Sequence, residues 1–277
     1  MISDPAAAAL GLMVSSAADM YASDPTDLAP ALDVRLARDW ELLGHLTARD
    51  AVFRKGPMGL GFTVFYGFLA RSIQDPGRHV AVIRGTGNLV EWFEDAIFIS
   101  KPHPIAGHVE SGFADVYDSM QYAHLGAVPG SLVSGIATAV GSGLLTVVGH
   151  SLGSALATYL TFDLAYVLTD RADGCFLASP HAGDSVFAAA FDAKVKQYKL
   201  INRVLDAVPH VPIGLGYEHP VRVRWVWPHE EQVRVKSGIG CGHHVLVYSA
   251  VLDKDSAWDS PSPLDKPMAA CVIGVNA

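Results

Sequence analysis

A glycine–serine–glycine cluster between two apolar runs constrains the fold of this chain more than any other feature. It lies in the stretch LLTVVGHSLGSALATYLTF, residues 144–162. The first run, 144–149, has the short, apolar character of a strand buried in a parallel sheet. The second run is rich in alanine and leucine, which favours a helix. Because Gly149 and Gly153 have no Cβ, a strand and a helix can cross closely here. The pattern therefore predicts a strained strand-to-helix turn from which Ser151 projects.

Strand and helix signals alternate along the chain, which predicts an α/β fold with a mainly parallel sheet and helices on both faces. The strand-like stretches are 61–73, 79–85, 144–149, 174–180, 199–206, 221–227 and 231–237, of which the last two could form a hairpin. The stretches expected to be helical are 130–140, about 153–169, 183–195 and 243–252. Apolar residues at helical spacing within 27–46 extend a further helical region over 5–50.

Length and composition indicate one globular unit. At 277 residues the chain can form one large α/β domain, and it contains no repeat or linker. We expect a single domain over 1–277, with a helical region over 1–50 and an irregular tail over about 256–277. Half of the residues are hydrophobic and 17% are charged, which excludes a disordered chain. A net charge of −8 without clusters of lysine or arginine argues against a nucleic-acid partner.

The spacing of the cysteines and histidines predicts neither a disulfide framework nor a metal centre. Cys175, Cys241 and Cys271 show no C-x-x-C spacing and cannot all pair, so no disulfide framework or zinc site is expected. The twelve histidines show no H-E-x-x-H spacing, so no metal is expected. The N-terminus has Asp4 where a signal peptide has a basic region, so we predict no signal peptide, and the compartment stays open. No segment has the ~18 to 20 continuous apolar residues of a transmembrane helix.

Ser151 needs two partners for nucleophilic chemistry, because a base must take its proton and an acid must orient that base. After a G-x-S-x-G turn, the acid and then a histidine follow along the chain. Asp206 ends an apolar predicted strand, at the carboxyl edge where sheet enzymes keep their sites. The rival aspartates lie in predicted helices, turns or caps: Asp163, Asp170, Asp173, Asp184 and Asp192. Among the later histidines, only His243 and His244 lie on a loop that leads into an apolar helix.

The adjacent histidines differ in their expected positions. Residues three, four and seven positions after His244 are apolar or aromatic, so His244 begins the helix on its inward face. His243 follows Gly242 on the loop, where its ring is freer to reach Ser151. We therefore assign the base to His243 and keep His244 as the alternative.

Six motifs follow one another as they do in class 3, fungal-type lipases, which this chain resembles over about residues 60–252. They are RGTGNLVEWFEDA, GHSLGSALAT, SPHAGDSVFAAAFD, RVLDAVPHVP, YEHPV and CGHHVLVYS. The resemblance implies the α/β-hydrolase fold and a catalytic triad formed by Ser151, Asp206 and a histidine of the late pair, to which His243 fits best. The tyrosine five residues after His243 matches the family pattern.

The same resemblance implies an oxyanion hole and a lid. The oxyanion hole would consist of Thr86, which follows Arg-Gly, and the backbone N–H of Leu152, which follows the serine. The lid segment would bring Trp92 and Phe93 to the lip of the substrate site, and the alternative is that Trp92 is buried as part of the core. Two positions depart from the family pattern. Ser154 replaces a usual glycine and should crowd the start of the helix, and His181 stands where an arginine is common.

The function implied by the resemblance is hydrolysis of carboxylic esters, of acylglycerols or related lipids, through an acyl-serine intermediate and without a cofactor. The partner would be a lipid or other ester substrate, met at a lipid–water interface if the lid operates. A phospholipase, a short-chain carboxylesterase or a feruloyl-type esterase on the same triad is the alternative within enzymes. An inactive lipid- or protein-binding module is the alternative outside them. The sequence does not define the acyl-chain preference or the oligomeric state.

Overall fold

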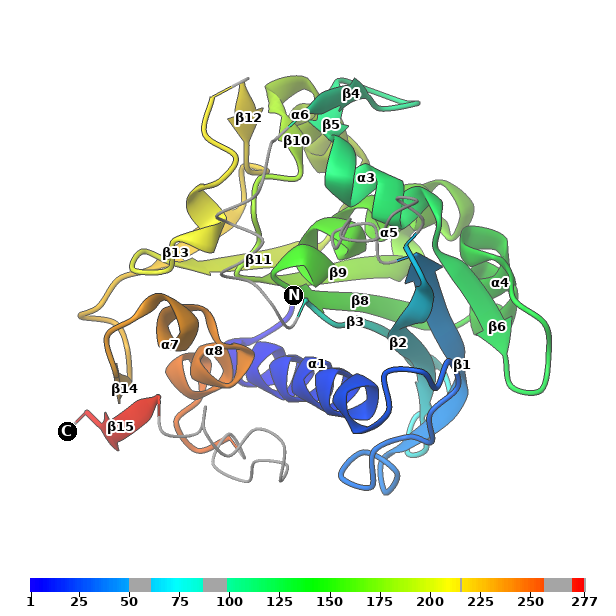
Figure 1. Cartoon of the computed structure of the whole chain (residues 1–277), viewed down its shortest axis with the longest axis horizontal. Coiled ribbons are helices and arrows are strands. Elements are labelled where there is room, and N and C mark those ends of the chain that lie inside the picture. Colours follow the sequence, from blue (N-terminus) through cyan, green and yellow to red (C-terminus); the bar gives the residue numbers. More distant parts are fainter. Residues whose placement is uncertain (50–60, 87–98, 215, 257–270, 277) are drawn as a thin grey trace.

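A large twisted sheet forms the centre of the computed structural model, which describes residues 1–49, 61–86, 99–214, 216–256 and 271–276 (Figure 1). In spatial order its strands are β13 (Val223–Val226), β11 (Tyr198–Arg203), β9 (Ala172–Leu177), β8 (Leu144–His150), β3 (Arg78–Ile83), β2 (Thr63–Ser72), β1 (Trp40–Arg49), β6 (Gln121–His124) and β7 (Gly130–Ser131). From β13 to β3 every pairing is parallel, and from β3 to β7 every pairing is antiparallel. Because each antiparallel pairing reverses direction, only β2 and β6 run against the rest. The predicted mainly parallel sheet is confirmed.

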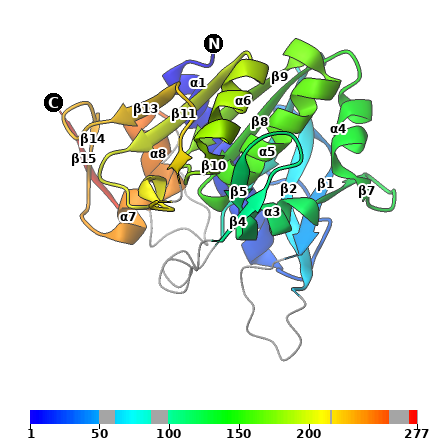
Figure 2. The ribbon, with the colours of Figure 1, turned by 90° about the horizontal axis from the view of Figure 1, so that it is seen from above.

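Helices cover both faces of this sheet, as predicted (Figures 1 and 2). One face packs against α1 (Asp4–Ser23) and α8 (Val245–Leu252). The other packs against α3 (Ser111–Asp118), α4 (Leu132–Val140), α5 (Leu152–Val167) and α6 (Ser185–Lys194). Successive strand residues point to opposite faces, so neighbours such as Val147 and Val148 enter different cores. The central strands are therefore buried on both sides and read as apolar runs.

The shorter elements lie at the margins of the sheet. A four-stranded sheet contains β4 (Ser100–Pro102), β5 (His108–Glu110), β10 (Gly183–Asp184) and β12 (Tyr217–Glu218). A two-stranded sheet contains β14 (Val233–Val235) and β15 (Val272–Val275). The remaining short helices are η1 (Thr169–Arg171), η2 (Val208–His210) and α7 (Ile239–His243). In the part of the chain that the structure describes, none of the helices has the length and apolarity that crossing a bilayer requires.

The helical prediction for residues 5–50 is correct for α1 and wrong for residues 24–39, which form loops and turns, and for residues 40–49, which form β1. Strand β1 lies between β2 and β6 and is hydrogen-bonded to both. Backbone pairing on two sides and burial on both faces outweigh the helical spacing of its apolar residues, since tertiary packing overrides local propensity. Pro30 and the turns at 34–39 separate β1 from α1.

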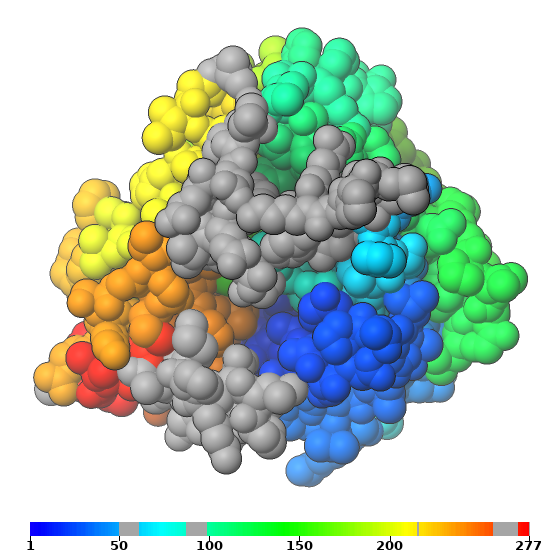
Figure 3. All heavy atoms as spheres, viewed as in Figure 1, coloured from blue at the N-terminus to red at the C-terminus, as the bar shows by residue number. Residues whose placement is uncertain are grey.

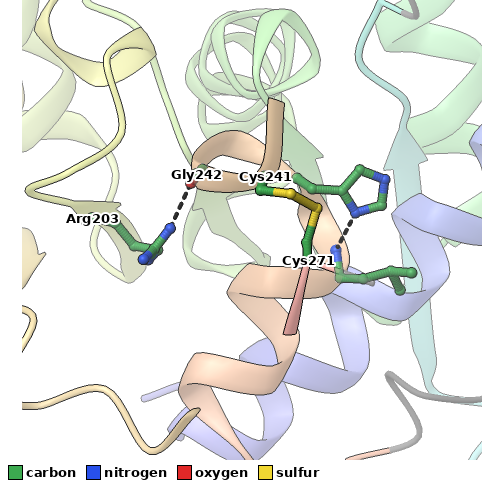
Figure 4. Close-up of a disulfide and its surroundings, with 6 residues drawn as sticks. Arg203, Cys241, Gly242 and Cys271 are labelled. Carbon is green, nitrogen blue, oxygen red and sulfur yellow. Dashed lines mark hydrogen bonds between the residues drawn. A yellow bond between two sulfur atoms is a disulfide. The ribbon is translucent and has the colours of Figure 1, made fainter. Parts of the chain in front are cut away.

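The C-terminal region differs from prediction in three ways. Strand β14 pairs with β15 instead of forming a hairpin with the preceding strand. The expected irregular tail therefore contains a strand at Val272–Val275. Cys241 and Cys271 form a disulfide, although no disulfide framework was expected from three cysteines, while Cys175 is buried and free (Figure 4). In the space-filling view the C-terminal residues, coloured red, lie against the orange segment that carries α7 and α8 (Figure 3).

Candidate active site

Ser151 occupies a strained turn between β8 and α5, as predicted. Its φ of 60° and ψ of −131° lie where residues with a Cβ are rarely found. A Cβ at Gly149 would lie 2.1 Å from the carbonyl oxygen of Gly153, and a Cβ at Gly153 would lie 2.5 Å from that of Ile83. Both glycines are therefore required for the helix to cross the strands this closely. The side chain of Ser151 is held at the carboxyl edge of the sheet.

Asp206 and His243 meet at the same edge. Asp206 lies three residues beyond β11, and His243 is the last residue of α7, so it closes a short helix instead of lying on the predicted loop. The Nδ1 atom of His243 donates to Oδ2 of Asp206 at 2.8 Å. Both side chains are buried. Of the predicted triad, the structure thus joins these two by a direct hydrogen bond.

Tyr248 supports Asp206 from α8. Its hydroxyl donates to Oδ2 of Asp206 at 2.7 Å, and the backbone N–H of Val208 donates to Oδ1 at 3.0 Å. Burial, and then the charge of Asp206, raise the pKa of Tyr248 well above its usual value, so the phenol keeps its proton. In the sequence, Tyr248 only distinguishes between the adjacent histidines, because its contact with Asp206 depends on tertiary structure.

His150 is a second residue of the site that sequence reasoning missed. Its Nε2 donates to the backbone oxygen of His243 at 2.7 Å, and the two rings lie 4.6 Å apart. Complete burial, and then the neighbouring His243 and His244, hold the pKa of His150 well below its usual range. His150 is therefore a neutral donor that fixes the backbone of His243. Its position before Ser151 was the available signal.

Two polar atoms of the site have no partner among the described residues. They are Oγ of Ser151 and Nε2 of His243, both buried. Buried polar atoms are almost always hydrogen-bonded, so an unpaired donor and acceptor indicate a site prepared for a ligand or for proton transfer. Catalytic hydrogen bonds are also often long before substrate binds.

The residues predicted for the oxyanion hole lie beside Ser151. A Cβ at Gly85 would be 3.3 Å from Cβ of Ser151, so the segment that continues into Thr86 passes the serine closely. Leu152 begins α5, where helix N–H groups carry partial positive charge. Trp92 and Phe93 lie outside the described residues, so the lid stays a prediction.

The rival residues have other partners. Among the aspartates, Asp163 accepts from Tyr117 and Asp184 caps α6 by accepting from Phe187. Asp170 lies in η1, beyond the helix assigned to it from sequence. His244 caps α8, where its Nδ1 accepts from the backbone of Leu246 at 3.2 Å. The inference that His244 begins the helix is confirmed, and its ring caps the N-terminus of α8.

The two departures from the family pattern are accommodated by contacts. Ser154 is fully buried, and its hydroxyl lies 2.7 Å from the carbonyl oxygens of both Gly149 and Leu177. These contacts give the extra hydroxyl partners at the start of α5, and the carbonyl oxygen of Leu177 also accepts from the backbone N–H of Ser151 at 3.0 Å. His181 packs its ring 4.2 Å from that of His219. In the described ranges, no group of three or more His, Cys, Asp or Glu residues could hold a metal ion.

Part of the chain is similar to known lipases. The sequence profile of Lipase (class 3) matches residues 80–215. A secreted mono- and diacylglycerol lipase, MDL2, of Malassezia globosa is 36% identical over 88 residues, which are 30% of this chain and 29% of the relative. Secreted mono- and diacylglycerol lipase A of Penicillium cyclopium is 26% identical over 182 residues, 60% of this chain and 57% of the relative. The matches thus span less than two thirds of these relatives.

Solved structures support the fold. The lipase–propeptide complex of Rhizomucor miehei superposes with a TM-score of 0.58 and 20% identity, over 90% of this chain and 79% of that chain. A mutant form of MDLA from Penicillium cyclopium superposes with a TM-score of 0.57 and 19% identity, over 96% and 92% of the two chains. The chain is thus similar to the class 3, fungal-type lipases over residues 80–215 and has the α/β-hydrolase fold.

Proposed function

We propose that this chain is a serine hydrolase that cleaves carboxylic ester bonds of lipids through an acyl-serine intermediate. The proposal rests above all on one observation. Among the described residues, Oγ of Ser151 and Nε2 of His243 are buried and unpaired, while the other ring nitrogen of His243 is bonded to Asp206. A nucleophile, a base with one free nitrogen and an acid that orients the base are the parts that acyl transfer needs.

In the proposed reaction, Oγ of Ser151 attacks the ester carbonyl carbon while Nε2 of His243 takes the hydroxyl proton. The carbonyl oxygen becomes an oxyanion that accepts from Thr86 and from the backbone N–H of Leu152. The intermediate collapses as the alcohol leaves with the proton from His243. Water then attacks the acyl-serine and gives a proton to His243, which returns that proton to Oγ of Ser151 as the carboxylic acid is released. Asp206 stays ionised and stabilises the imidazolium.

Acylglycerols are the proposed substrates. The relatives from Malassezia and Penicillium that match this chain are named as mono- and diacylglycerol lipases, which supports partial acylglycerols as substrates. A panel of mono-, di- and triacylglycerols, phosphatidylcholine and p-nitrophenyl esters of increasing chain length tests this. We expect the highest kcat/KM on an acylglycerol. A preference for phosphatidylcholine or for short p-nitrophenyl esters would instead identify a phospholipase or a short-chain esterase.

The nucleophile is tested by Ser151→Ala, with Ser134→Ala on the exposed side of α4 as the control. We expect Ser151→Ala to keep its fold and to lose about four to six powers of ten in kcat, because only binding and oxyanion stabilisation remain. A fluorophosphonate probe should label the wild type and Ser134→Ala and should leave Ser151→Ala unlabelled. If Ser151→Ala keeps more than about a tenth of the wild-type rate, Ser151 is not the nucleophile. If the wild-type protein is neither labelled nor active, the chain is a binding module.

A further inference from the structure

Three consecutive residues at the end of α7 are each anchored to a different part of the molecule. Cys241 is joined to Cys271 by the disulfide, and the carbonyl oxygen of Gly242 accepts from Nη1 of Arg203 at 2.6 Å (Figure 4). The carbonyl oxygen of His243 accepts from Nε2 of His150 at 2.7 Å. The backbone of His243, the proposed base, is therefore fixed in position and direction.

Arg203 is the only one of these anchors that carries a full charge, and it is 2% exposed at the end of β11. Its Nε and Nη2 donate to Oε1 of Glu231 at 2.9 and 2.7 Å. Glu231 is also buried, and its backbone oxygen accepts from the side chain of Asn276 at 2.7 Å. A planar guanidinium held along one edge by a carboxylate has a fixed orientation. Its remaining nitrogen is thus aimed at Gly242.

The backbone of Arg203 reaches the other half of the Asp206–His243 pair. Its N–H donates to the hydroxyl oxygen of Tyr248 at 3.0 Å, and that hydroxyl donates to Oδ2 of Asp206. Arg203 therefore makes two contacts with this pair. Its side chain bonds to Gly242, which precedes His243, and its main chain bonds to Tyr248, which holds Asp206. Removing either contact would allow the acid and the base to move relative to each other.

We propose that Arg203, oriented by Glu231, is a positioning residue that holds His243 in line with Asp206 and Ser151. This inference rests on the proposed function. A small displacement of a reacting group can cost about 100-fold in rate, so the guanidinium acts on kcat rather than on substrate binding. The competing explanation is a purely structural ion pair that stabilises the fold without directing the base.

The two explanations predict different values of kcat when Arg203 and Glu231 are both replaced by apolar residues of similar size. Exchanging a buried ion pair for apolar residues of similar size is often neutral or stabilising. The double variant R203M/E231M should therefore melt near the wild-type temperature, while Gly242 loses its donor. We expect kcat to fall about 10- to 100-fold with KM unchanged. Arg35→Met removes the ion pairs of Arg35 with Asp19 and Asp33. It leaves the ion pair of Arg203 with Glu231 in place, so it is the control and should keep kcat.

A spectroscopic measurement accompanies the kinetics. The proton on Nδ1 of His243, donated to Asp206, should give a downfield proton resonance in the wild type that broadens or shifts in R203M/E231M and persists in Arg35→Met. Because this signal needs no substrate, it tests the positioning role even if the wild type hydrolyses no ester. Wild-type kcat together with an unchanged resonance in the double variant would overturn the proposal.

If the double variant does not fold, Arg203→Lys decides the question. Lysine keeps a positive charge beside Glu231, but one ammonium cannot serve Glu231 and Gly242 with the geometry of the guanidinium fork. We expect a folded protein with a kcat between those of the wild type and an inactive enzyme, and an altered resonance. Full kcat with the wild-type resonance in Arg203→Lys would show that the pair is structural alone.

Discussion

Neighbouring residues of the same type perform different tasks in this site. His243 and His244 are adjacent, yet the ring of the first is bonded to Asp206 and the ring of the second caps α8. The difference arises because α7 ends at His243 and α8 begins after His244, so the chain turns between them. Their roles follow from where each Cβ points, since the intrinsic chemistry of both imidazoles is the same.

Alanine substitution at each histidine tests this division. His243→Ala should lose several powers of ten in kcat/KM on a soluble ester, because Ser151 would have no base. His244→Ala should lower the free energy of unfolding by about 1 kcal/mol through the lost cap and leave kcat/KM close to that of the wild type. Measuring kcat/KM and urea unfolding for both variants decides the assignment. An inactive His244→Ala beside an active His243→Ala would show that the base is His244.

At the scale of elements, the site depends on the crossing of α5 over β3 and β8. The turn at Ser151 brings the first residues of α5 into direct contact with the ends of β3 and β8. A Cβ at Gly153 would meet the carbonyl oxygens of Ile83 and Arg84 at 2.5 and 2.6 Å. Both are backbone atoms of the segment from the end of β3 to Thr86, so the helix cannot move without moving that segment.

Gly153→Ala should therefore affect both stability and catalysis. We expect the free energy of unfolding to fall by about 2 kcal/mol or more, because overpacking here displaces backbone instead of a side chain. We also expect kcat to fall as Ser151 and Thr86 separate. Gly130→Ala is the control, because a Cβ there meets nothing within 4 Å, and it should change stability by less than about 0.5 kcal/mol. Urea unfolding and ester hydrolysis measure both effects, and equal stability of the two variants would refute the argument.

At the scale of the whole molecule, one sheet joins two apolar cores, and we propose that they form a single domain. Several histidines of this fold are buried or half-buried. Burial lowers the pKa of His219 to about 3, with the neighbouring His181 contributing next. The same cause lowers the pKa of other histidines across the fold: His45, His79, His103, His150 and His181. The folded protein thus keeps imidazoles neutral that the unfolded chain would protonate.

Because these histidines have a lower pKa in the folded protein than in the unfolded chain, we expect the protein to lose stability in acid. Between the folded pKa of His219, about 3, and an unfolded pKa of about 6.5, the unfolded chain binds more protons. The free energy of unfolding therefore falls as pH drops from about 6.5 towards 3, by a few kcal/mol at most for this residue, because one pKa unit corresponds to about 1.4 kcal/mol. Burial raises the pKa of Glu110 and Asp163, which stabilises the fold in acid and opposes this trend.

Urea unfolding of the wild type and of His219→Gln at several pH values between 7.5 and 4.5 tests the contribution of His219. Glutamine keeps a donor for the carbonyl oxygen of Pro209, which Nε2 of His219 contacts at 2.8 Å, but it does not titrate. The dependence of stability on pH should be shallower in His219→Gln than in the wild type. His124→Gln, at an exposed position, should retain the wild-type slope. Parallel curves for all three proteins would exclude His219 as a source of acid sensitivity.

The sequence by itself determined the local parts of this protein. The turn at Ser151 was predictable because an apolar strand, two glycines and a helix lie within about twenty residues, so a local pattern encodes the strand-to-helix turn. The place of Asp206 at the same edge as Ser151 was predictable, since the carboxyl ends of parallel strands share one edge. The order serine, acid, histidine along the chain then indicated the late histidine pair. The alternation of strands and helices predicted the mainly parallel sheet, because parallel strands are joined by helical crossovers.

Only the tertiary structure decided the features that join distant segments. Residues 40–49 have helical spacing, yet β1 forms because β2 and β6 offer backbone partners on both sides. Cys241 finds Cys271 because β15 pairs with β14, a pairing that no local signal indicates. Arg203 looks like an ordinary residue at the end of a strand until folding buries it against Glu231 and Gly242. A buried charge has to be paired, and which partner pairs with it is decided by packing, which a local pattern does not contain.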